Sequence, residues 1–301
     1  MRILDFLIAI LVIVIWGFNF IFIKYGLDEI PPLLFCAIRF FLASIPIIFF
    51  IKLPKVPFKM VALYGMTIFG LQFSCLFTSM YVGMTPSIAS VLIQTQVFFS
   101  LFFAAIFLKQ KLHLWQIGGA LISFSGIALV GIHLDQSISL LGFLLVVAGA
   151  ASWGVGNLFA AQLKHVNPFA LVAWGSFVAC IPTFFFSLLI EGPGAIILSY
   201  THISALGIIA ILYVVYLSTW TAYGAWNWLL SRHSVATIAP FTLLVPVVGM
   251  LSSAWILNEP IPFWKILVAI LVTFGLLINL LGARYFARKN PPITPRPILP
   301  S

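Results

Sequence analysis

The sequence predicts an all-α integral membrane protein with ten transmembrane helices, arranged as two inverted five-helix repeats. Three observations predict this fold: an apolar composition, ten apolar runs of membrane-spanning length, and motifs that recur in order along the chain. Of the 301 residues, 63% are hydrophobic and only 7% are charged, and the mean hydropathy is +1.19. Because an average soluble domain is about a quarter charged, this composition excludes a soluble enzyme or a soluble nucleic-acid-binding protein.

Ten apolar runs are each long enough to cross a hydrocarbon core, which is about 30 Å thick and takes about 20 helical residues. The connectors between them are short and contain prolines, glycines and charged residues, which favour turns. The first run contains Trp16 and Asn19 and has no small-residue cleavage site, so we read it as a retained span rather than a signal peptide. The expected spans are 4–23, 32–51, 60–80, 86–108, 112–131, 140–162, 169–190, 204–230, 235–257 and 263–282.

The basic residues gather in every second connector. The chain has 15 Lys and Arg against 6 Asp and Glu, which gives a formal net charge of +9. Cytoplasmic connectors of membrane proteins are enriched in Lys and Arg, so this placement predicts that both termini are cytoplasmic. It also accounts for the net charge without a nucleic-acid partner. The basic residues on the predicted cytoplasmic side are Arg2, Lys52, Lys55, Lys59, Lys109, Lys111, Lys164, Arg232, Arg284, Arg288, Lys289 and Arg296.

Several motifs recur in the same order in the two halves of the chain. Because five is an odd number of spans, the second copy of a five-helix unit crosses the membrane in the opposite orientation, as in the inverted repeats of secondary transporters. The alternative is that Trp, Gly and Pro recur by chance. We expect the first repeat at 1–135, the second at 136–283, and a cytoplasmic, Pro-rich and disordered tail at 284–301. The matched residues are Trp16-Gly17 with Trp153-Gly154, Pro32 and Pro46 with Pro168 and Pro182, and Trp115 and Gly126 with Trp264 and Gly275.

Five polar aromatic and amide side chains in the eighth span form the clearest candidate binding site. Their spacing of 3, 4, 3 and 4 residues places them on one face of an α-helix. Hydroxyl and indole N–H groups at this depth need partners, and such surfaces suit a small zwitterion. We therefore favour a cavity lining, with an aromatic packing seam as the alternative. The five residues are Tyr213, Tyr216, Trp220, Tyr223 and Asn227.

A Trp/Asn pair occurs at the equivalent place in each half of the chain. Trp16 and Asn19 are three residues apart, and Trp153 and Asn157 are four apart, so each pair shares a helix face. The alternative is a purely structural role, because Asn in a membrane helix often forms a hydrogen bond to a neighbouring helix. Recurrence in both copies places the pairs near the pseudo-twofold axis, where transporters bind substrate, so binding and structural roles both stay open.

The fourth span carries glutamines at membrane depth, where an amide needs a partner. We favour Gln94 as the one that faces a cavity because it shares a helix face with Ser87 and Ser90, whereas Gln96 points elsewhere. Gln72 in the third span is a weaker candidate, with helix–helix hydrogen bonding as its expected role.

Prolines inside the spans remove intrahelical hydrogen bonds and free carbonyl groups, that of Thr242 among them. Such carbonyls are tolerated only when buried in protein or facing a polar cavity. The candidate hinges are Pro46, Pro182, Pro240 and Pro246, and static kinks that help packing are the alternative.

Arg39 is a charged residue deep inside a span, about 10 Å from its start at 1.5 Å per residue. Its guanidinium stays protonated, so it needs carbonyls, a carboxylate or a path to the interface. The nearest acidic residues in the expected topology are Asp28, Glu29 and Glu259. We favour a structural anchor over binding of a substrate carboxylate.

Groups for catalysis, metal binding or proton relay are missing from the spans. No Asp or Glu lies in the middle of a span, the five histidines lie in or beside connectors, and the three cysteines show no paired spacing. These features predict no metal or cofactor, and transport that is not obligatorily driven by proton entry. An integral membrane enzyme that modifies lipids is disfavoured, because it would need such a cluster near one interface.

Motifs along essentially the whole chain, to about Arg284, resemble the EamA branch of the drug/metabolite transporter superfamily. They are Trp16-Gly-Phe-Asn-Phe, Ile38-Arg39-Phe40 and Leu243-Leu-Val-Pro-Val-Val-Gly249. The last of these, with Pro31-Pro32-Leu33 and Pro54-Lys55-Val56-Pro57, is similar to exporters of O-acetylserine and cysteine within that branch.

The resemblance implies 5+5 inverted helices in a bacterial inner membrane, with the lipid bilayer and a small-molecule substrate as partners. It implies export of small amino-acid-like metabolites by alternating access, with another small neutral or aromatic compound or drug as the alternative. One departure is visible: Lys109-Gln110 stand where the family usually has Gly-Glu, whereas Glu259 keeps the acidic residue in the second copy.

Overall fold

A computed structural model describes residues 2–134, 138–163, 165–233 and 235–289 of the chain. Within these ranges every regular element is a helix. Nine helical runs among the described residues are long and apolar enough to cross a membrane, and Pro240–Ile256 forms a shorter apolar helix. The ten expected spans are therefore present. The Pro-rich tail beyond residue 289 and the repeat boundary expected at 135–136 lie outside the described residues.

The first five spans start with α1 (Ile3–Leu27) and α2 (Pro32–Ser44), which a 3₁₀ turn, η1 (Ile47–Phe49), follows. The third span is α3 (Phe58–Gly65), a π-helical segment η2 (Met66–Leu71) and α4 (Gln72–Tyr81). The fourth is α5 (Pro86–Leu92), a 3₁₀ turn η3 (Ile93–Thr95) and α6 (Gln96–Phe107), and the fifth is α7 (Leu114–Ile132).

The last five spans start with α8 (Leu140–Gln162) and α9 (Pro168–Ile190). The eighth span is α11 (Ala205–Leu212), a π-helical segment η4 (Tyr213–Thr221) and α12 (Ala222–Arg232). The ninth is α13 (Val235–Ile238), a 3₁₀ segment η5 (Ala239–Leu244) and α14 (Val245–Ile256), and the tenth is α15 (Phe263–Lys289).

One helix was not predicted from the sequence: α10 (Pro193–His202), in the connector between the seventh and eighth spans. Pro193 starts it at the first helical position, where a missing N–H costs nothing. Ten residues are too few to cross a bilayer, and Ile197, Leu198 and Tyr200 are exposed. The chain therefore turns at this connector through a short surface helix rather than an irregular loop.

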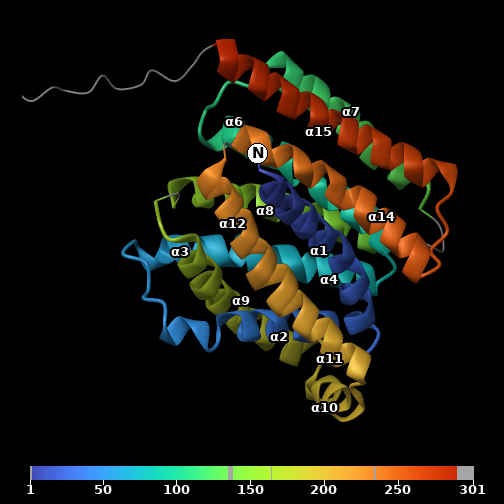
Figure 1. The fold of residues 1–301 in the computed structure, drawn as a ribbon. Helices are drawn as coiled ribbons and strands as arrows, with labels where there is room; N and C mark the ends of the chain where they lie inside the picture. The colour runs from blue at the N-terminus through green and yellow to red at the C-terminus, as the bar shows by residue number, and fades with distance from the viewer. Residues whose placement is uncertain (1, 135–137, 164, 234, 290–301) are drawn as a thin grey trace, which may run out of the picture.

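The helix packing repeats between the two halves of the chain. α2 packs against α9 and α7 packs against α15, each helix with its own counterpart; α7 and α15 lie side by side along one edge of the molecule (Figure 1). α1 packs against α14, and its counterpart α8 packs against α6. In both contacts a glycine lets the two helices approach closely. A Cβ on Gly17 would lie 2.4 Å from Val248, and a Cβ on Gly154 would lie 2.7 Å from Phe99.

The two ends of the α7–α15 pair show the same internal symmetry. The ring of His133 stacks on Trp264 with centroids 4.6 Å apart. At the other end, a Cβ on Gly282 would lie 2.3 Å from the indole of Trp115. Trp115 and Trp264 are 149 residues apart, and their partners His133 and Gly282 are also 149 residues apart. The observed contacts thus follow the two-repeat design of the fold.

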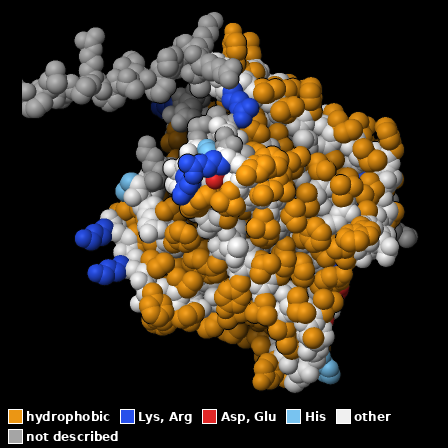
Figure 2. All heavy atoms as spheres, viewed as in Figure 1, with side chains coloured by type: hydrophobic (Ala, Val, Ile, Leu, Met, Phe, Trp, Pro, Cys, Tyr) orange, Lys and Arg blue, Asp and Glu red, His pale blue; other side chains and the backbone are white. Residues whose placement is uncertain are grey.

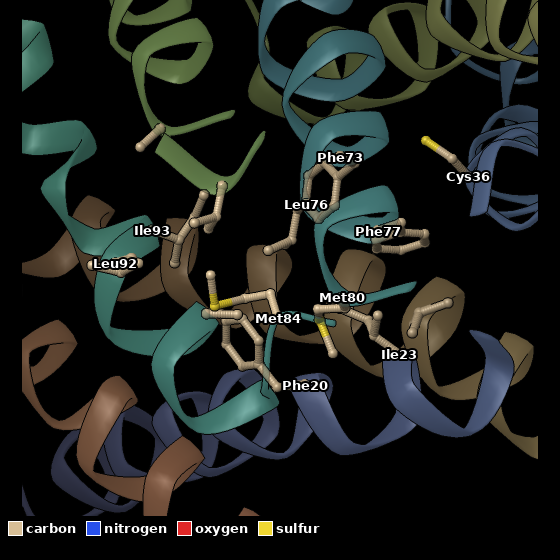
Figure 3. Packing of buried hydrophobic residues seen from close by; sticks show 14 of the residues in the cluster. Phe20, Ile23, Cys36, Phe73, Leu76, Phe77, Met80, Met84, Leu92 and Ile93 are labelled. Atoms are coloured by element: carbon tan, nitrogen blue, oxygen red, sulfur yellow. The ribbon is translucent and has the colours of Figure 1, made fainter. Parts of the chain in front are cut away.

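Buried apolar side chains pack closely at one end of the bundle. We call the end at which α1 begins the near end, and the opposite end the far end. Phe20 and Ile23 of α1 lie beside Phe77 and Met80 of α4 and beside Met84, which precedes α5 (Figure 3). Each of these side chains is at most 5% exposed. Because they lie in the outer turns of α1 and α4, the far half of the bundle is a packed apolar core.

Three glutamates bind helix N-termini at the far end. Glu191 accepts hydrogen bonds from two backbone N–H groups in the first turn of α2, at 2.7 and 3.0 Å. Glu29 accepts from the backbone N–H of Ser204 ahead of α11 at 2.7 Å, and Glu259 accepts from that of Ser87 in α5 at 3.2 Å. Carboxylates are stabilised at helix N-termini, so each of these three contacts ties one span to a connector that is distant in the sequence.

Candidate functional site

A cavity of about 480 Å³ lies at mid-depth of the bundle and extends towards the near end. Its lining extends from Phe20 in α1 to Asn279 and Ala283 in the C-terminal half of α15. The aromatic wall consists of Trp16, Phe20, Phe73, Trp153, Tyr223 and Trp226. The charged and amide groups in the wall are Asn19, Arg39, Gln72, Gln94, Gln96 and Asn279.

Four spans lose regular α-helical geometry at, or directly before, the residues that line this cavity. The third and eighth spans are π-helical over Met66–Leu71 and Tyr213–Thr221, and the fourth and ninth are 3₁₀-helical over Ile93–Thr95 and Ala239–Leu244. The interruptions are counterparts in the two repeats, and each π-helical segment follows an α-helix of eight residues. Irregular turns of this kind are frequent at functional sites, and at membrane depth they must be buried or line a cavity.

Gln94 joins the fourth and ninth spans. Its Nε2 donates a hydrogen bond to the carbonyl of Thr242 at 3.0 Å. Pro246 stands four residues after Thr242 and has no N–H, so it cannot supply the α-helical donor for that carbonyl. The sequence predicted that Pro246 frees this carbonyl, and Gln94 provides the partner.

Trp16 makes the corresponding link between the first and eighth spans. Its Nε1 donates to the carbonyl of Ser218, within the π-helical segment, at 3.3 Å. Its ring also packs on Tyr223 and Trp226, with centroids 5.5 and 5.3 Å apart. Trp16 therefore holds one aromatic wall of the cavity against the irregular part of the eighth span.

Arg39 lies in the cavity wall and is 1% exposed. One guanidinium nitrogen, Nη2, donates to Thr219 Oγ1 at 3.1 Å, and the ring of Phe73 covers the guanidinium with its centroid 4.1 Å from Cζ. The Nε and Nη1 atoms have no hydrogen-bond partner. The acidic residues expected nearest to it are engaged elsewhere: Glu29 and Glu259 bind helix N-termini.

Three amide oxygens in the cavity wall also have no partner. They are Asn19 Oδ1, Gln72 Oε1 and Gln96 Oε1, and all three are buried. An unpaired buried acceptor is costly, so these oxygens indicate a site at which a ligand or water donates hydrogen bonds. The cavity thus combines one cationic donor with several acceptors between aromatic surfaces.

The structure brings together six of the residues singled out in the sequence. Trp16, Asn19, Gln94, Trp153, Tyr223 and Arg39 all line the cavity. That they bind substrate stays a prediction.

The remaining members of the eighth-span stripe do not reach this cavity. Tyr216 is 44% exposed on the outer surface, Tyr213 Oη donates to the carbonyl of Ile15 at 2.9 Å, and Trp220 stacks on Phe169 with centroids 6.3 Å apart. Asn227 is absent from the lining. The expectation of one shared face is wrong because the π-helical segment has a different number of residues per turn from an α-helix.

Asn157, the second-copy partner of Asn19, takes the structural role that the sequence left open. Its Nδ2 donates to Ser100 Oγ at 2.8 Å, which joins α8 to α6, and it does not line the cavity. The two halves of the chain therefore use equivalent asparagines differently.

The candidate hinge prolines occupy three kinds of position. Pro46 follows the end of α2, Pro182 lies inside the continuous helix α9, and Pro240 and Pro246 lie in the first turns of η5 and α14. Only Pro240 falls within one of the irregular segments at the cavity. Hinge motion at these residues stays a prediction.

Sequence reasoning undervalued or missed several lining residues. Gln72 and Gln96 face the cavity rather than serving only between helices, and Phe73, Trp226 and Asn279 were not singled out. A polar residue in the apolar run around Asn279 was an available signal. Trp226 carried none, because its orientation depends on the register that follows the π-helical segment.

Comparison with known proteins decides the family. Residues 4–132 and 140–281 each match the EamA-like transporter family. The chain belongs to this family. This EamA-like transporter is thus a multi-pass membrane protein and not an enzyme, as its sequence predicts. The exact repeat boundaries, expected at 1–135 and 136–283, stay a prediction.

The EamA-like transporter is similar to curated proteins over nearly its whole length. It is 38% identical over 287 residues to a protein of Escherichia coli (strain K12) named "Probable amino-acid metabolite efflux pump", covering 93% of this chain and 96% of that protein. A protein of the same name from Salmonella typhimurium (strain LT2) is 37% identical over 286 residues, with the same coverage of 93% and 96%. The "Uncharacterized transporter YoaV" of Bacillus subtilis (strain 168) is 27% identical, covering 89% and 94%.

A solved structure named only "Crystal structure of protein" shares the fold of this transporter. It superimposes with a TM-score of 0.61 over 95% of this chain and 99% of that chain, at 16% sequence identity. At this identity the likeness supports the fold alone.

Proposed function

We propose that this membrane exporter moves small amino-acid-like metabolites, of the O-acetylserine and cysteine type, out of a bacterial cytoplasm across the inner membrane. The single observation that carries the proposal is the chemistry of the central cavity. It offers both unpartnered donors and unpartnered acceptors between aromatic walls, in a volume of about 480 Å³. A small zwitterion needs both kinds of group. Two relatives at 37–38% identity, named amino-acid metabolite efflux pumps, support it.

The packing of the bundle supports an alternating-access mechanism. The far end is closed by the apolar core around Phe77 and Met80 and by the three glutamate contacts, whereas the cavity lining continues towards the near end. In the proposed topology the near end is cytoplasmic. The structure then corresponds to a state that receives substrate from the cytoplasm, and export requires the far-end contacts to open.

A second candidate function is export of a small neutral aromatic compound or drug. The observation in its favour is the aromatic wall of Trp16, Phe20, Trp153, Tyr223 and Trp226. Aromatic surfaces contribute stacking energy for any flat apolar ligand. This candidate does not use the cationic donor of the cavity.

Counterflow in proteoliposomes tests the proposal. Vesicles loaded with unlabelled cysteine or O-acetylserine should accumulate the labelled compound from outside, and the rate should saturate with concentration. A panel of neutral aromatic compounds run in parallel should give no counterflow. If only the aromatic compounds exchange, the second candidate replaces the first.

The driving force is tested with the same vesicles. No acidic side chain that the structure describes lines the cavity, which favours export down the substrate gradient or by exchange. An imposed pH gradient without a substrate gradient should therefore drive no accumulation. Concentrative uptake under that condition would show obligatory proton coupling.

The proposed orientation places both termini in the cytoplasm. On the face shown in Figure 2, Lys and Arg side chains gather at one end of the molecule, where the connector before α3 lies in Figure 1. Single cysteines in 52–59 or 109–111 should react with a membrane-impermeant reagent only from the cytoplasmic side. Cysteines at His133 and Glu191 should react from the other side, and labelling of position 133 from the cytoplasm would contradict the topology.

A further inference from the structure

Arg39 carries a charge that the described part of the chain does not neutralise. No ion pair joins it to any acidic residue that the structure describes. Those acidic residues all have other partners. They are Asp5 with His233, Asp28 with Lys24, Glu29 with Ser204, Glu191 with the first turn of α2, and Glu259 with Lys265.

A guanidinium stays charged at any physiological pH, and an isolated charge in a low-dielectric interior is strongly unfavourable. The single hydrogen bond to Thr219 Oγ1 satisfies one of its five N–H groups. Its flat face is covered by Phe73, which leaves the N–H groups of Nε and Nη1 for a partner. Both atoms are buried and unpartnered in the cavity wall, where an anion that enters the cavity would be their complement.

The eighth span holds the guanidinium in this position. Thr219 Oγ1 donates to the carbonyl of Val214, five residues earlier, at 2.8 Å, and accepts from Arg39. The π-helical segment therefore fixes the hydroxyl lone pair towards Arg39. The irregular geometry of the eighth span thus has a role: it presents Thr219 Oγ1 as an uncharged acceptor that orients the Arg39 guanidinium and leaves its charge unpaired.

We propose that Arg39 binds the carboxylate of the substrate and makes a carboxylate a requirement for transport. The ammonium group of the same substrate donates to the unpartnered oxygens of Asn19, Gln72 and Gln96. This inference rests on the proposed function and narrows it to substrates with a free carboxylate. Esters, amides and decarboxylated amines of the same side chain leave Arg39 unpaired and are rejected.

Competition in the counterflow assay tests this requirement in the wild-type protein. Exchange of labelled L-cysteine should be inhibited by unlabelled L-cysteine, but not by cysteine methyl ester or cysteamine at the same concentration. Inhibition by the ester or the amine equal to that by cysteine would overturn the carboxylate requirement and leave the exporter function standing. Absence of any counterflow with cysteine or O-acetylserine would reject the proposed function, and the inference with it.

Variants then assign the requirement to Arg39. Hydrogen bonds to charged groups are worth about 1.5–3 kcal/mol, so Arg39→Gln should raise the half-saturating cysteine concentration about 10- to 100-fold. Arg39→Lys keeps the charge and should recover part of the loss. Arg232→Gln is the matched control, because Arg232 is exposed and lies outside the cavity lining.

Two further readouts separate binding from folding. The thermal unfolding temperature of each purified variant shows whether it is folded, and Thr219→Val, which keeps the charge, should raise the half-saturating concentration less than Arg39→Gln. A folded Arg39→Gln protein with an unchanged half-saturating concentration for cysteine and a lower maximal rate would make Arg39 a structural residue and refute the inference.

Discussion

The Glu259–Lys265 pair at the far end is a buried contact whose disruption should strongly destabilise the state seen here. Glu259 Oε1 lies 2.8 Å from Lys265 Nζ, and the two side chains are only 8% and 3% exposed. The carboxylate also accepts hydrogen bonds from the backbone N–H and hydroxyl of Ser87. Glu259→Gln keeps the shape of the side chain but leaves a buried ammonium without a counter-charge.

Removing one partner of a buried ion pair costs about 3–5 kcal/mol. Every 1.4 kcal/mol is a tenfold change in an equilibrium, so the unfolding equilibrium constant should rise by a factor on the order of 100 or more. Lys24→Gln is the control, because the Lys24–Asp28 pair is 38% and 53% exposed and such pairs contribute less than about 1 kcal/mol.

The assay is the free energy of unfolding in mixed detergent micelles, measured for both variants and for Glu259→Gln/Lys265→Gln. The double variant should recover part of the stability, because it removes the unpaired charge. A loss for Glu259→Gln no larger than that for Lys24→Gln, with no recovery in the double variant, would refute the reasoning.

Two further predictions concern helix contact and the aromatic wall. Gly119→Ala should lower the unfolding temperature, because a Cβ there would lie 2.6 Å from the carbonyl oxygen of Gly275, whereas Gly118→Ala has nothing within 4 Å and should not. Equal unfolding temperatures would show that α7 and α15 separate without cost. Tyr223→Ala should raise the half-saturating substrate concentration in counterflow, because Tyr223 lines the cavity. Tyr216→Ala should leave transport unchanged, since Tyr216 is 44% exposed on the outer surface, and an equal effect of the two would contradict this placement of the site.

The sequence by itself determined the number of spans and their approximate bounds. A span needs about 20 apolar residues. The start of a helix depends on the local sequence, and Pro32, Pro86 and Pro168 each stand in the first turn of a helix. The run 140–162 was predicted with the bounds that α8 has. These features follow from hydropathy and backbone chemistry, which depend on neighbouring residues in the chain. The short helix α10 was not predicted, because its ten residues are too few to give the hydropathy signal of a membrane span.

The sequence also indicated that polar groups at membrane depth meet near the middle of the bundle. It singled out Trp16 and Asn19 because the pair recurs in both repeats, and Gln94 because an amide at membrane depth needs a partner; all three line the cavity. The prediction that Tyr216 faces the cavity was wrong, because it assumed α-helical periodicity along a segment that is π-helical. The change from one hydrogen-bond pattern to the other has no signature in the residue types of that span.

Only the tertiary structure decided which polar groups have partners and which do not. Asn19 and Asn157 are equivalent in sequence, yet the oxygen of the first is unpartnered in the cavity while the amide nitrogen of the second is bonded to Ser100. Arg39 could have met a carboxylate at the far end, but those carboxylates bind helix N-termini instead. The physical reason is that the partner of a buried polar group depends on how each helix is rotated against its neighbours. That rotation is set by close contacts between distant segments, such as Gly17 with Val248.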